Sequence, residues 1–78
     1  MKYRRIRDLR EDRDMNQTEV ARYLHMSQTV YSKYETGEND IPTGILIQLA
    51  RLYNVSIDYL LGQTNNPTRY APPAEETT

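Results

Sequence analysis

The chain has 78 residues, a formal charge of −1, no cysteine and no tryptophan. A chain of this length forms one domain with a small core, and without cysteine it has neither disulfide bonds nor cysteine-bound metal to stabilise that core. The near-neutral charge argues against non-specific binding of polyanions, so a role with nucleic acid would need a local arrangement of hydrogen-bond donors.

Two short helices are predicted in the first third of the chain. Apolar residues at helical spacing among charged ones predict the first helix over residues 3–13. Asn16 followed three residues later by Glu19 is a capping-box pattern, because each side chain can bond the other residue's backbone N–H. This pattern predicts a second helix over about residues 17–24.

A third helix is predicted directly after the second. Ser27 is a good N-cap for a helix over residues 28–36, and Gly37 can end it in the left-handed conformation. The two helices then meet across a short turn that begins at His25. Because His is among the side chains enriched at positive φ, we expect His25 to be a turn residue rather than a ligand or a base.

Two more helices follow. Thr43 is expected to cap a fourth helix, which runs to Tyr53 and has the strongest amphipathic pattern in the chain. Ser56 is expected to cap a fifth helix over residues 57–61, which ends at Gly62.

The composition changes after the fifth helix, where Thr, Asn, Pro and Glu leave almost nothing apolar to bury. We therefore predict an all-α domain of five helices over residues 1–62 and a polar, Pro- and Thr-rich tail over residues 63–78. No run approaches the ~20 apolar residues of a membrane helix, so we expect a soluble, cytoplasmic protein.

The third predicted helix has two different faces. On a helical wheel, Tyr31, Tyr34 and Glu35 gather on one side. The remaining polar face carries amide, hydroxyl and ammonium groups, which can bond base edges in the major groove: Gln pairs bidentately with adenine, and Lys reaches guanine or phosphate. Taken alone, the same face could be an ordinary solvated helix surface. Its members are Gln28, Thr29, Ser32 and Lys33.

A phosphate-binding position is predicted at the start of the second helix. Gln17 lies there beside unpaired N–H groups and the positive end of the helix dipole, which favour an anion. A phosphate contact carries no sequence information, so Gln17 is expected to strengthen binding to all sequences alike.

Five stretches, in this order and at these spacings, make the chain resemble the Cro/cI-type (xenobiotic-response-element type) helix-turn-helix family of bacterial and phage repressors. The resemblance covers residues 6–62 and implies a compact five-helix, lambda-repressor-like fold, with the helix-turn-helix formed by the second and third helices. The stretches are Ile6-Arg7-Asp8-Leu9-Arg10, Asn16-Gln17-Thr18-Glu19-Val20-Ala21, residues 27–37, Pro42 with residues 46–52, and residues 55–62.

The resemblance also implies roles for individual residues. Four would face bases, four would contact phosphates through side chains or nearby backbone N–H groups, and two would form an ion pair that ties the first helix to the base-reading helix. The base-facing residues would be Gln28, Thr29, Ser32 and Lys33. The phosphate contacts would be Gln17, Ser27, Asn39 and Thr43, and the ion pair would be Arg10 with Glu35.

Three features depart from the family pattern. His25 stands where the family often has Gly in the turn. Tyr31 occupies a core position that is usually aliphatic, which suggests a ring between helices with its hydroxyl reaching an edge. The loop after Gly37 carries Glu38 and Asp40 where relatives often carry basic residues, so attraction to phosphates should be weaker there.

The function implied is a sequence-specific, DNA-binding transcriptional regulator, with repression the commoner expectation for the family. It would bind a double-stranded operator as a homodimer through Ile57, Leu60 and Leu61 of the fifth helix. The alternative is a protein-interaction module of the same fold, such as an antitoxin or adaptor domain. The tail could also be the linker of a longer regulator.

Enzymatic function is not expected. The chain has no cysteine, no Gly-rich phosphate loop, no pair of histidines and no carboxylate pair at a defined spacing in an expected cleft. We therefore expect no catalytic residue, metal, cofactor or small-molecule ligand.

Overall fold

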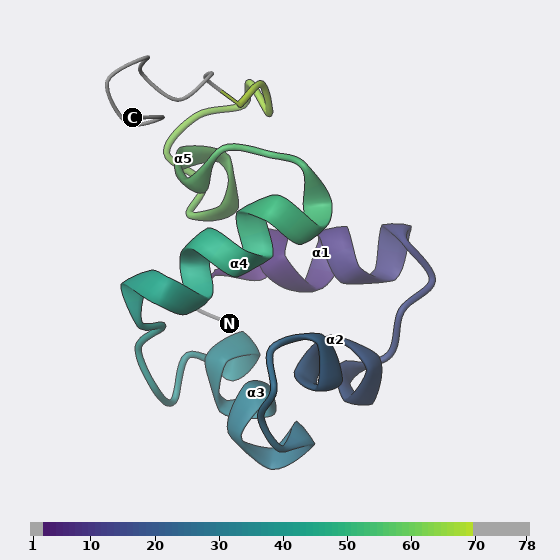
Figure 1. The fold of residues 1–78 in the computed structure, drawn as a ribbon. Helices are drawn as coiled ribbons and strands as arrows, with labels where there is room; N and C mark the ends of the chain where they lie inside the picture. The colour runs from purple at the N-terminus through teal and green to yellow at the C-terminus, as the bar shows by residue number, and fades with distance from the viewer. Residues whose placement is uncertain (1–2, 70–78) are drawn as a thin grey trace, which may run out of the picture.

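A computed structural model describes residues 3–69, which form five helices and no strand (Figure 1). The predicted all-α fold is confirmed, and the predicted helix ends differ from the observed ones by at most one residue. The helices are α1 (Arg4–Asp12), α2 (Gln17–Tyr23), α3 (Gln28–Thr36), α4 (Thr43–Tyr53) and α5 (Ile57–Leu60).

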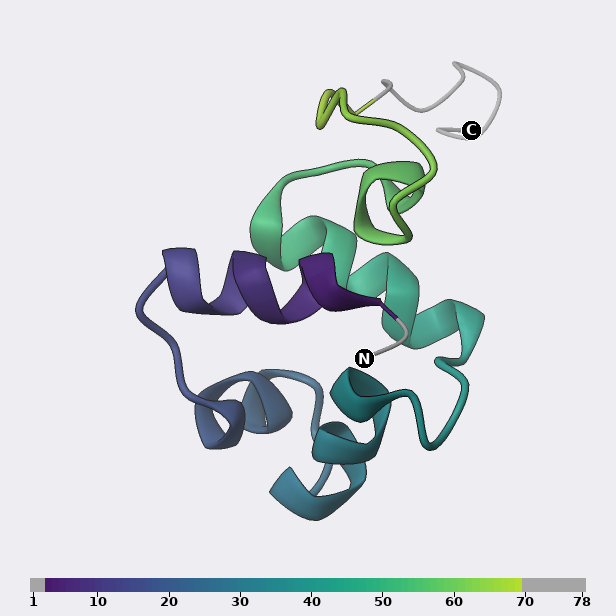
Figure 2. The ribbon, with the colours of Figure 1, turned by 180° about the vertical axis from the view of Figure 1, so that it is seen from behind.

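The helices form a central crossing with a group of helices at each end. In two opposite views, α1 and α4 cross in the middle of the molecule, α2 and α3 lie at one end and α5 lies at the other (Figures 1 and 2). Contacts join α2 to α3, α4 to α5, and α1 to both α3 and α5. The first helix therefore connects the two ends of the molecule.

The core receives one completely buried side chain from every helix. These side chains have no exposed surface, and burying one of their size contributes about 1.5–3 kcal/mol relative to leaving it exposed. They are Ile6, Val20, Tyr31, Leu49 and Leu60.

The helix starts follow the predicted capping residues in three of the four predicted cases. The Asn16 side chain accepts from the Glu19 N–H at 2.8 Å, and Glu19 accepts from the Asn16 N–H at 2.9 Å, which completes the capping box. Ser27 and Ser56 each accept an N–H bond from the residue three positions later.

Thr43 was predicted to cap α4, and this prediction is wrong. Pro42 takes the cap position with extended backbone angles, and its carbonyl accepts the N–H groups of Ile45 and Leu46. Thr43 is the first residue inside the helix, because the carbonyl that starts the ladder belongs to the proline before it.

The turn between α2 and α3 forms without glycine. His25 adopts a positive φ of 58°, as its position in the turn predicted, and Gly37 ends α3 with a φ of 84°. The turn backbone is closed by a bond from the Met26 N–H to the Ala21 carbonyl at 3.0 Å.

Part of the segment predicted as a tail is bound to the helices. The Arg5 guanidinium donates to the carbonyls of Tyr59 at 3.1 Å and Thr64 at 2.7 Å, and to the Asn65 side chain at 3.2 Å. It also lies over the Tyr59 ring, 4.1 Å from its centre. Thr64 and Asn65 are therefore fastened to α1, and the Pro67 carbonyl accepts the N–H of Ser56 at 3.1 Å, just before α5. Residues 70–78 of the predicted tail lie outside the described part of the chain.

None of the helices among residues 3–69 is long and apolar enough to cross a membrane.

Replacing Arg5 with Met should lower the free energy of unfolding by about 1–2 kcal/mol, because three charge-assisted hydrogen bonds and the stacking on Tyr59 are lost. The matched control is Arg4→Met, one residue earlier on α1. The Arg4 side chain is 83% exposed and pairs only loosely with Asp8, so this change should cost less than about 0.5 kcal/mol. Urea unfolding measures both, and equal losses would contradict a fastening role for Arg5.

Candidate nucleic-acid interface

The four residues predicted to read bases lie on the outer side of α3. Gln28 and Thr29 are exposed, and Ser32 and Lys33 are partly exposed. The opposite side of α3 is buried, with Tyr31 and Glu35 almost fully enclosed and Tyr34 9% exposed. The polar face is therefore available to a ligand, and no described part of the chain covers Gln28 or Thr29.

An ion pair fixes α3 to α1. The Arg10 Nε and Nη2 atoms donate to the two oxygens of the Glu35 carboxylate at 2.7 and 3.2 Å. The Arg10 side chain is 12% exposed and the Glu35 side chain 1% exposed, so the pair is largely removed from water. The pair is the one implied by the family resemblance. It is completed by a bond from Arg10 Nη1 to the Met15 carbonyl at 2.8 Å.

Glu35 accepts two further hydrogen bonds within the same site. The Tyr31 hydroxyl donates to Oε2, and the Gln17 Nε2 atom donates to Oε1 at 3.1 Å. Burial by itself raises the pKa of the Glu35 carboxyl, but the bonds from Arg10, Tyr31 and Gln17 outweigh it and hold the pKa below its ordinary value. The carboxylate is therefore charged at neutral pH.

The position of Tyr31 differs from the expectation. Its ring is fully buried between helices as expected, but its hydroxyl donates to Glu35 instead of reaching an edge. Burial, followed by the bond to Glu35, raises the pKa of the Tyr31 hydroxyl above its ordinary value. A tyrosine is accommodated at this core position because the buried carboxylate offers an acceptor to its O–H.

Gln17 and Gln28 are joined to each other. Gln28 Nε2 donates to Gln17 Oε1 across the two arms of the helix-turn-helix. Since Gln17 also donates to Glu35, a continuous chain of bonds runs from the buried ion pair to the exposed start of α3. The prediction of separate roles for Gln17 and Gln28 did not include this link, although both residues open their helices.

The other three residues predicted to contact phosphates, Ser27, Asn39 and Thr43, differ in which of their groups are free to bind one. Ser27 uses its hydroxyl to cap α3. The Asn39 N–H donates to the Lys33 carbonyl at 3.1 Å, so this backbone group is occupied and only the exposed side chain could meet a phosphate. Thr43 is exposed in the first turn of α4, where helix N–H groups lack intrahelical partners.

The acidic loop contacts the predicted base-reading face. Glu38 lies 3.7 Å from the ammonium group of Lys33, and both side chains are substantially exposed. This pair has to open before Lys33 can contact a base or a phosphate. Because exposed pairs contribute only about 0.2–1 kcal/mol, the opening is a minor cost.

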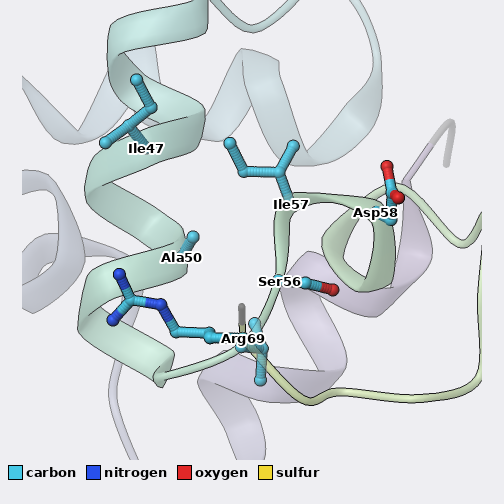
Figure 3. A pocket seen from close by; sticks show the side chains of 7 residues that line it. Ile47, Ala50, Ser56, Ile57, Asp58 and Arg69 are labelled. Atoms are coloured by element: carbon cyan, nitrogen blue, oxygen red, sulfur yellow. The ribbon is translucent and has the colours of Figure 1, made fainter. Parts of the chain in front are cut away.

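The predicted dimer surface on α5 requires a correction. Leu60 has no exposed surface and belongs to the core, so it cannot contact a second chain. Ile57 and Leu61 are partly exposed. Ile57 faces a shallow apolar groove between α4 and α5, across from Ile47, which is 38% exposed (Figure 3). Ile47 was not predicted from the sequence to be a contact residue. It could have been found, because Ile47 is a large apolar residue that lies outside the buried apolar stripe of α4.

Comparison with known proteins is consistent with this geometry. A family model described as helix-turn-helix matches residues 6–60. The chain is 36% identical over 63 residues to the "Uncharacterized HTH-type transcriptional regulator YobD" of Bacillus subtilis, which covers 81% of the chain and 56% of YobD. It is 37% identical over 60 residues to the "Cryptic phage CTXphi transcriptional repressor RstR" of Vibrio cholerae, which covers 77% of the chain and 54% of RstR.

A further relative is named an antitoxin and not a regulator of transcription. The chain is 31% identical over 58 residues to the "Antitoxin PezA" of Streptococcus pneumoniae, over 74% of the chain and 37% of PezA. The matched region thus spans about half, or less, of the length of these relatives.

Acid should weaken the fold through Glu35. Because its pKa in the fold lies below the ordinary value of 4.5, the stability it contributes is present above that value and is lost as the pH falls through the depressed pKa. Glu35→Gln should cost about 3–5 kcal/mol at pH 7, since Arg10 is left buried without its partner, and the difference from wild type should shrink toward pH 3. Urea unfolding between pH 7 and pH 3 measures this.

The matched control for that experiment is Glu11→Gln. Glu11 pairs with Arg7 at 3.3 Å on the exposed surface of α1, so its substitution should cost less than about 1 kcal/mol. Losses of the same size in the two variants at pH 7 would show that the Arg10–Glu35 pair has no special role.

Proposed function

The chain belongs to the Cro/cI-type helix-turn-helix family, and we propose that it is a sequence-specific DNA-binding regulator of transcription that acts as a repressor. The observation that carries the proposal is the outward polar face of α3, held on a buried ion pair. Binding in the cytoplasm to an operator near a promoter would block transcription by occupying the DNA, without enzymatic activity or a cofactor.

The side chains on α3 divide the work of recognition. Gln28 and Lys33 are long enough to reach base edges. The Gln28 amide can pair with adenine, and the Lys33 ammonium group can donate to guanine. Thr29 and Ser32 are short and allow the helix to approach the DNA closely. Gln17 is the first residue of α2 and Thr43 is the first residue of α4, and at these helix starts both would hold phosphates of the DNA backbone.

The charge of the chain makes local contacts decisive. With a net charge of −1 and Glu38 beside Lys33, the protein gains little from general attraction to DNA. Affinity then depends on direct contacts and on using two copies of the domain at once. We propose that the protein binds as a homodimer to two half-sites about one helical turn, roughly 34 Å, apart.

The apolar groove between α4 and α5 supports this dimer. Ile47 and Ile57 are its large apolar members. Leu61 is also partly exposed, but it lines a separate hollow next to α1. The groove lies between α4, in the middle of the molecule, and α5, at the end opposite α3, so a second chain there would leave the base-reading face uncovered (Figures 1 and 3). Leu60 would support this surface from within the core.

A second candidate function is an antitoxin or another protein-binding module of the same fold. The similarity to a protein named antitoxin and the apolar groove both support it. Recovery of a stable protein partner, with no retention of DNA at low salt, would favour this function over the first.

Sequence preference should depend on the α3 face. In a selection of bound sequences from random DNA, followed by affinity measurements on the selected operator, Gln28→Ala and Lys33→Ala should each lower discrimination at one base position by about 1–3 kcal/mol. Thr43→Ala is the matched control, because losing a phosphate contact weakens the selected and unrelated sequences alike. Unchanged preference in the Gln28→Ala, Lys33→Ala double variant would contradict the proposed function.

Self-association should depend on the groove. Ile47→Glu places a charge on its apolar side and should weaken the dimer at least about tenfold, measured by sedimentation equilibrium with and without operator DNA. Tyr23→Glu is the control, since Tyr23 is similarly exposed, at 42%, but lies on α2. A wild-type protein that stays monomeric in both conditions would contradict the homodimer.

A further inference from the structure

A hollow of about 520 Å³ lies between α2 and the start of α3, at the end of the molecule that these two helices form (Figure 1). Thr18 and Arg22 line it from α2, His25 and Ser27 from the turn, and Gln28 from the first turn of α3. Because Gln28 also belongs to the polar face of α3, the hollow adjoins the proposed base-reading face. A ligand that covers this face therefore passes beside the hollow.

The charge of the hollow has one sign. Within the described part of the chain, Arg22 and His25 are the charged or titratable side chains that line it, and no acidic side chain or tyrosine does. The other charged groups of α2 and α3 are engaged elsewhere. Glu19 completes the capping box of α2, Glu35 is enclosed in the buried ion pair, and Lys33 pairs with the acidic loop. The hollow is therefore suited to an anion.

Arg22 is available to such an anion. Its side chain is exposed, and no acidic group among residues 3–69 pairs with it, whereas Arg4, Arg7 and Arg10 all have acidic partners. A guanidinium presents planar N–H groups in the geometry that two phosphate oxygens accept. Binding an external phosphate through Arg22 breaks no ion pair of the described fold.

His25 is held beside Arg22 by the backbone of the turn. Its N–H donates to the Arg22 carbonyl at 3.1 Å, and its φ is 58°. A glycine would adopt this φ without strain, but a residue with a side chain does so only at a cost in energy. The strained position carries an imidazole at the edge of the hollow, and that imidazole is charged only when it is protonated.

The anion that reaches this place during DNA binding is a backbone phosphate. When α3 enters the major groove with Gln28 against a base edge, the sugar-phosphate backbone at the edge of the groove lies beside the start of the helix. With a net charge of −1, the chain gains little from general attraction, so two cationic groups without a neighbouring acid are a substantial local contribution.

We propose that Arg22 and His25 together bind one phosphate of the operator backbone in this hollow, and that His25 contributes only in its protonated form. The proposal rests on the proposed function and adds a site to it. Histidine gains its positive charge as the pH falls from about 8 to about 5, so DNA binding should strengthen over this range. This is the opposite direction from the effect of stronger acid on the fold, where protonation of Glu35 is destabilising.

The experiment measures the dissociation constant of the full chain and its selected operator by fluorescence anisotropy at about pH 8 and about pH 5.5. Wild-type binding should be at least about twofold tighter at the lower pH, and its log–log dependence on salt should steepen by about 0.9 for each copy of the domain bound. His25→Asn keeps a residue that tolerates positive φ and removes the titrating group, so the ratio of the two constants should fall to about one. A general weakening of the variant cancels in this ratio.

Arg22→Gln tests the other half of the site. It should lower the salt dependence by about 0.9 for each bound copy at both pH values, and it should weaken binding to the operator and to unrelated DNA alike. Arg51→Gln is the matched control and should leave the salt dependence unchanged. Arg51 is exposed and has no acidic partner among residues 3–69, as is true of Arg22, but it lies in the last turn of α4 and does not line the hollow. Circular dichroism establishes that each variant is folded.

The outcomes separate this inference from the proposed function. If the wild type selects no DNA sequence at either pH, the proposed function fails. If it selects a sequence, but His25→Asn keeps the wild-type ratio between the two pH values or Arg22→Gln behaves as Arg51→Gln does, the proposed function stands and the phosphate site of Arg22 and His25 is overturned.

Discussion

The buried carboxylate of Glu35 is the constraint on which the arrangement of α1, α2 and α3 depends. A charge this far from water is tolerated only when it is paired and its oxygens are saturated with donors, and here Arg10, Gln17 and Tyr31 supply them from three different helices. A shift of any one helix would leave a donor or the charge itself unsatisfied. In a domain with only one or two fully buried apolar side chains per helix, such a polar junction defines how the helices fit together.

The same junction reaches the surface at the base-reading end of α3. The residues that make the fold specific and the residue that we propose contacts DNA are thus consecutive members of one chain of hydrogen bonds, from Arg10 through Glu35 and Gln17 to Gln28. If Gln28 reads a base as proposed, a substitution inside the junction would change both the stability of the fold and the groups that α3 presents to the DNA. A flexible surface glutamine, by contrast, would have to be ordered by the DNA at a cost in side-chain entropy.

The opposite end of the molecule is organised by other contacts. Arg5 binds the backbone of α5 and of the segment that follows it, and an apolar groove lies between α4 and α5 (Figure 3). In the proposed dimer, a groove separated from α3 would let one small domain contact a second chain and DNA at the same time. The acidic loop with Glu38 lowers the general attraction to phosphates, which places more weight on simultaneous binding by two copies.

Local sequence determined the helices, since the caps at Asn16, Ser27 and Ser56 and the positive φ at His25 depend on neighbouring residues only. It also indicated the polar face of α3, because a helical wheel needs no knowledge of other helices. Tertiary structure decided what depends on segments distant in the sequence: Leu60 is in the core, Thr64 and Asn65 are held by Arg5, and the Tyr31 hydroxyl donates to Glu35. The bond between Gln17 and Gln28 also depends on tertiary structure. It forms only when α2 and α3 have packed against each other beside the buried Glu35 carboxylate, which needs hydrogen-bond donors.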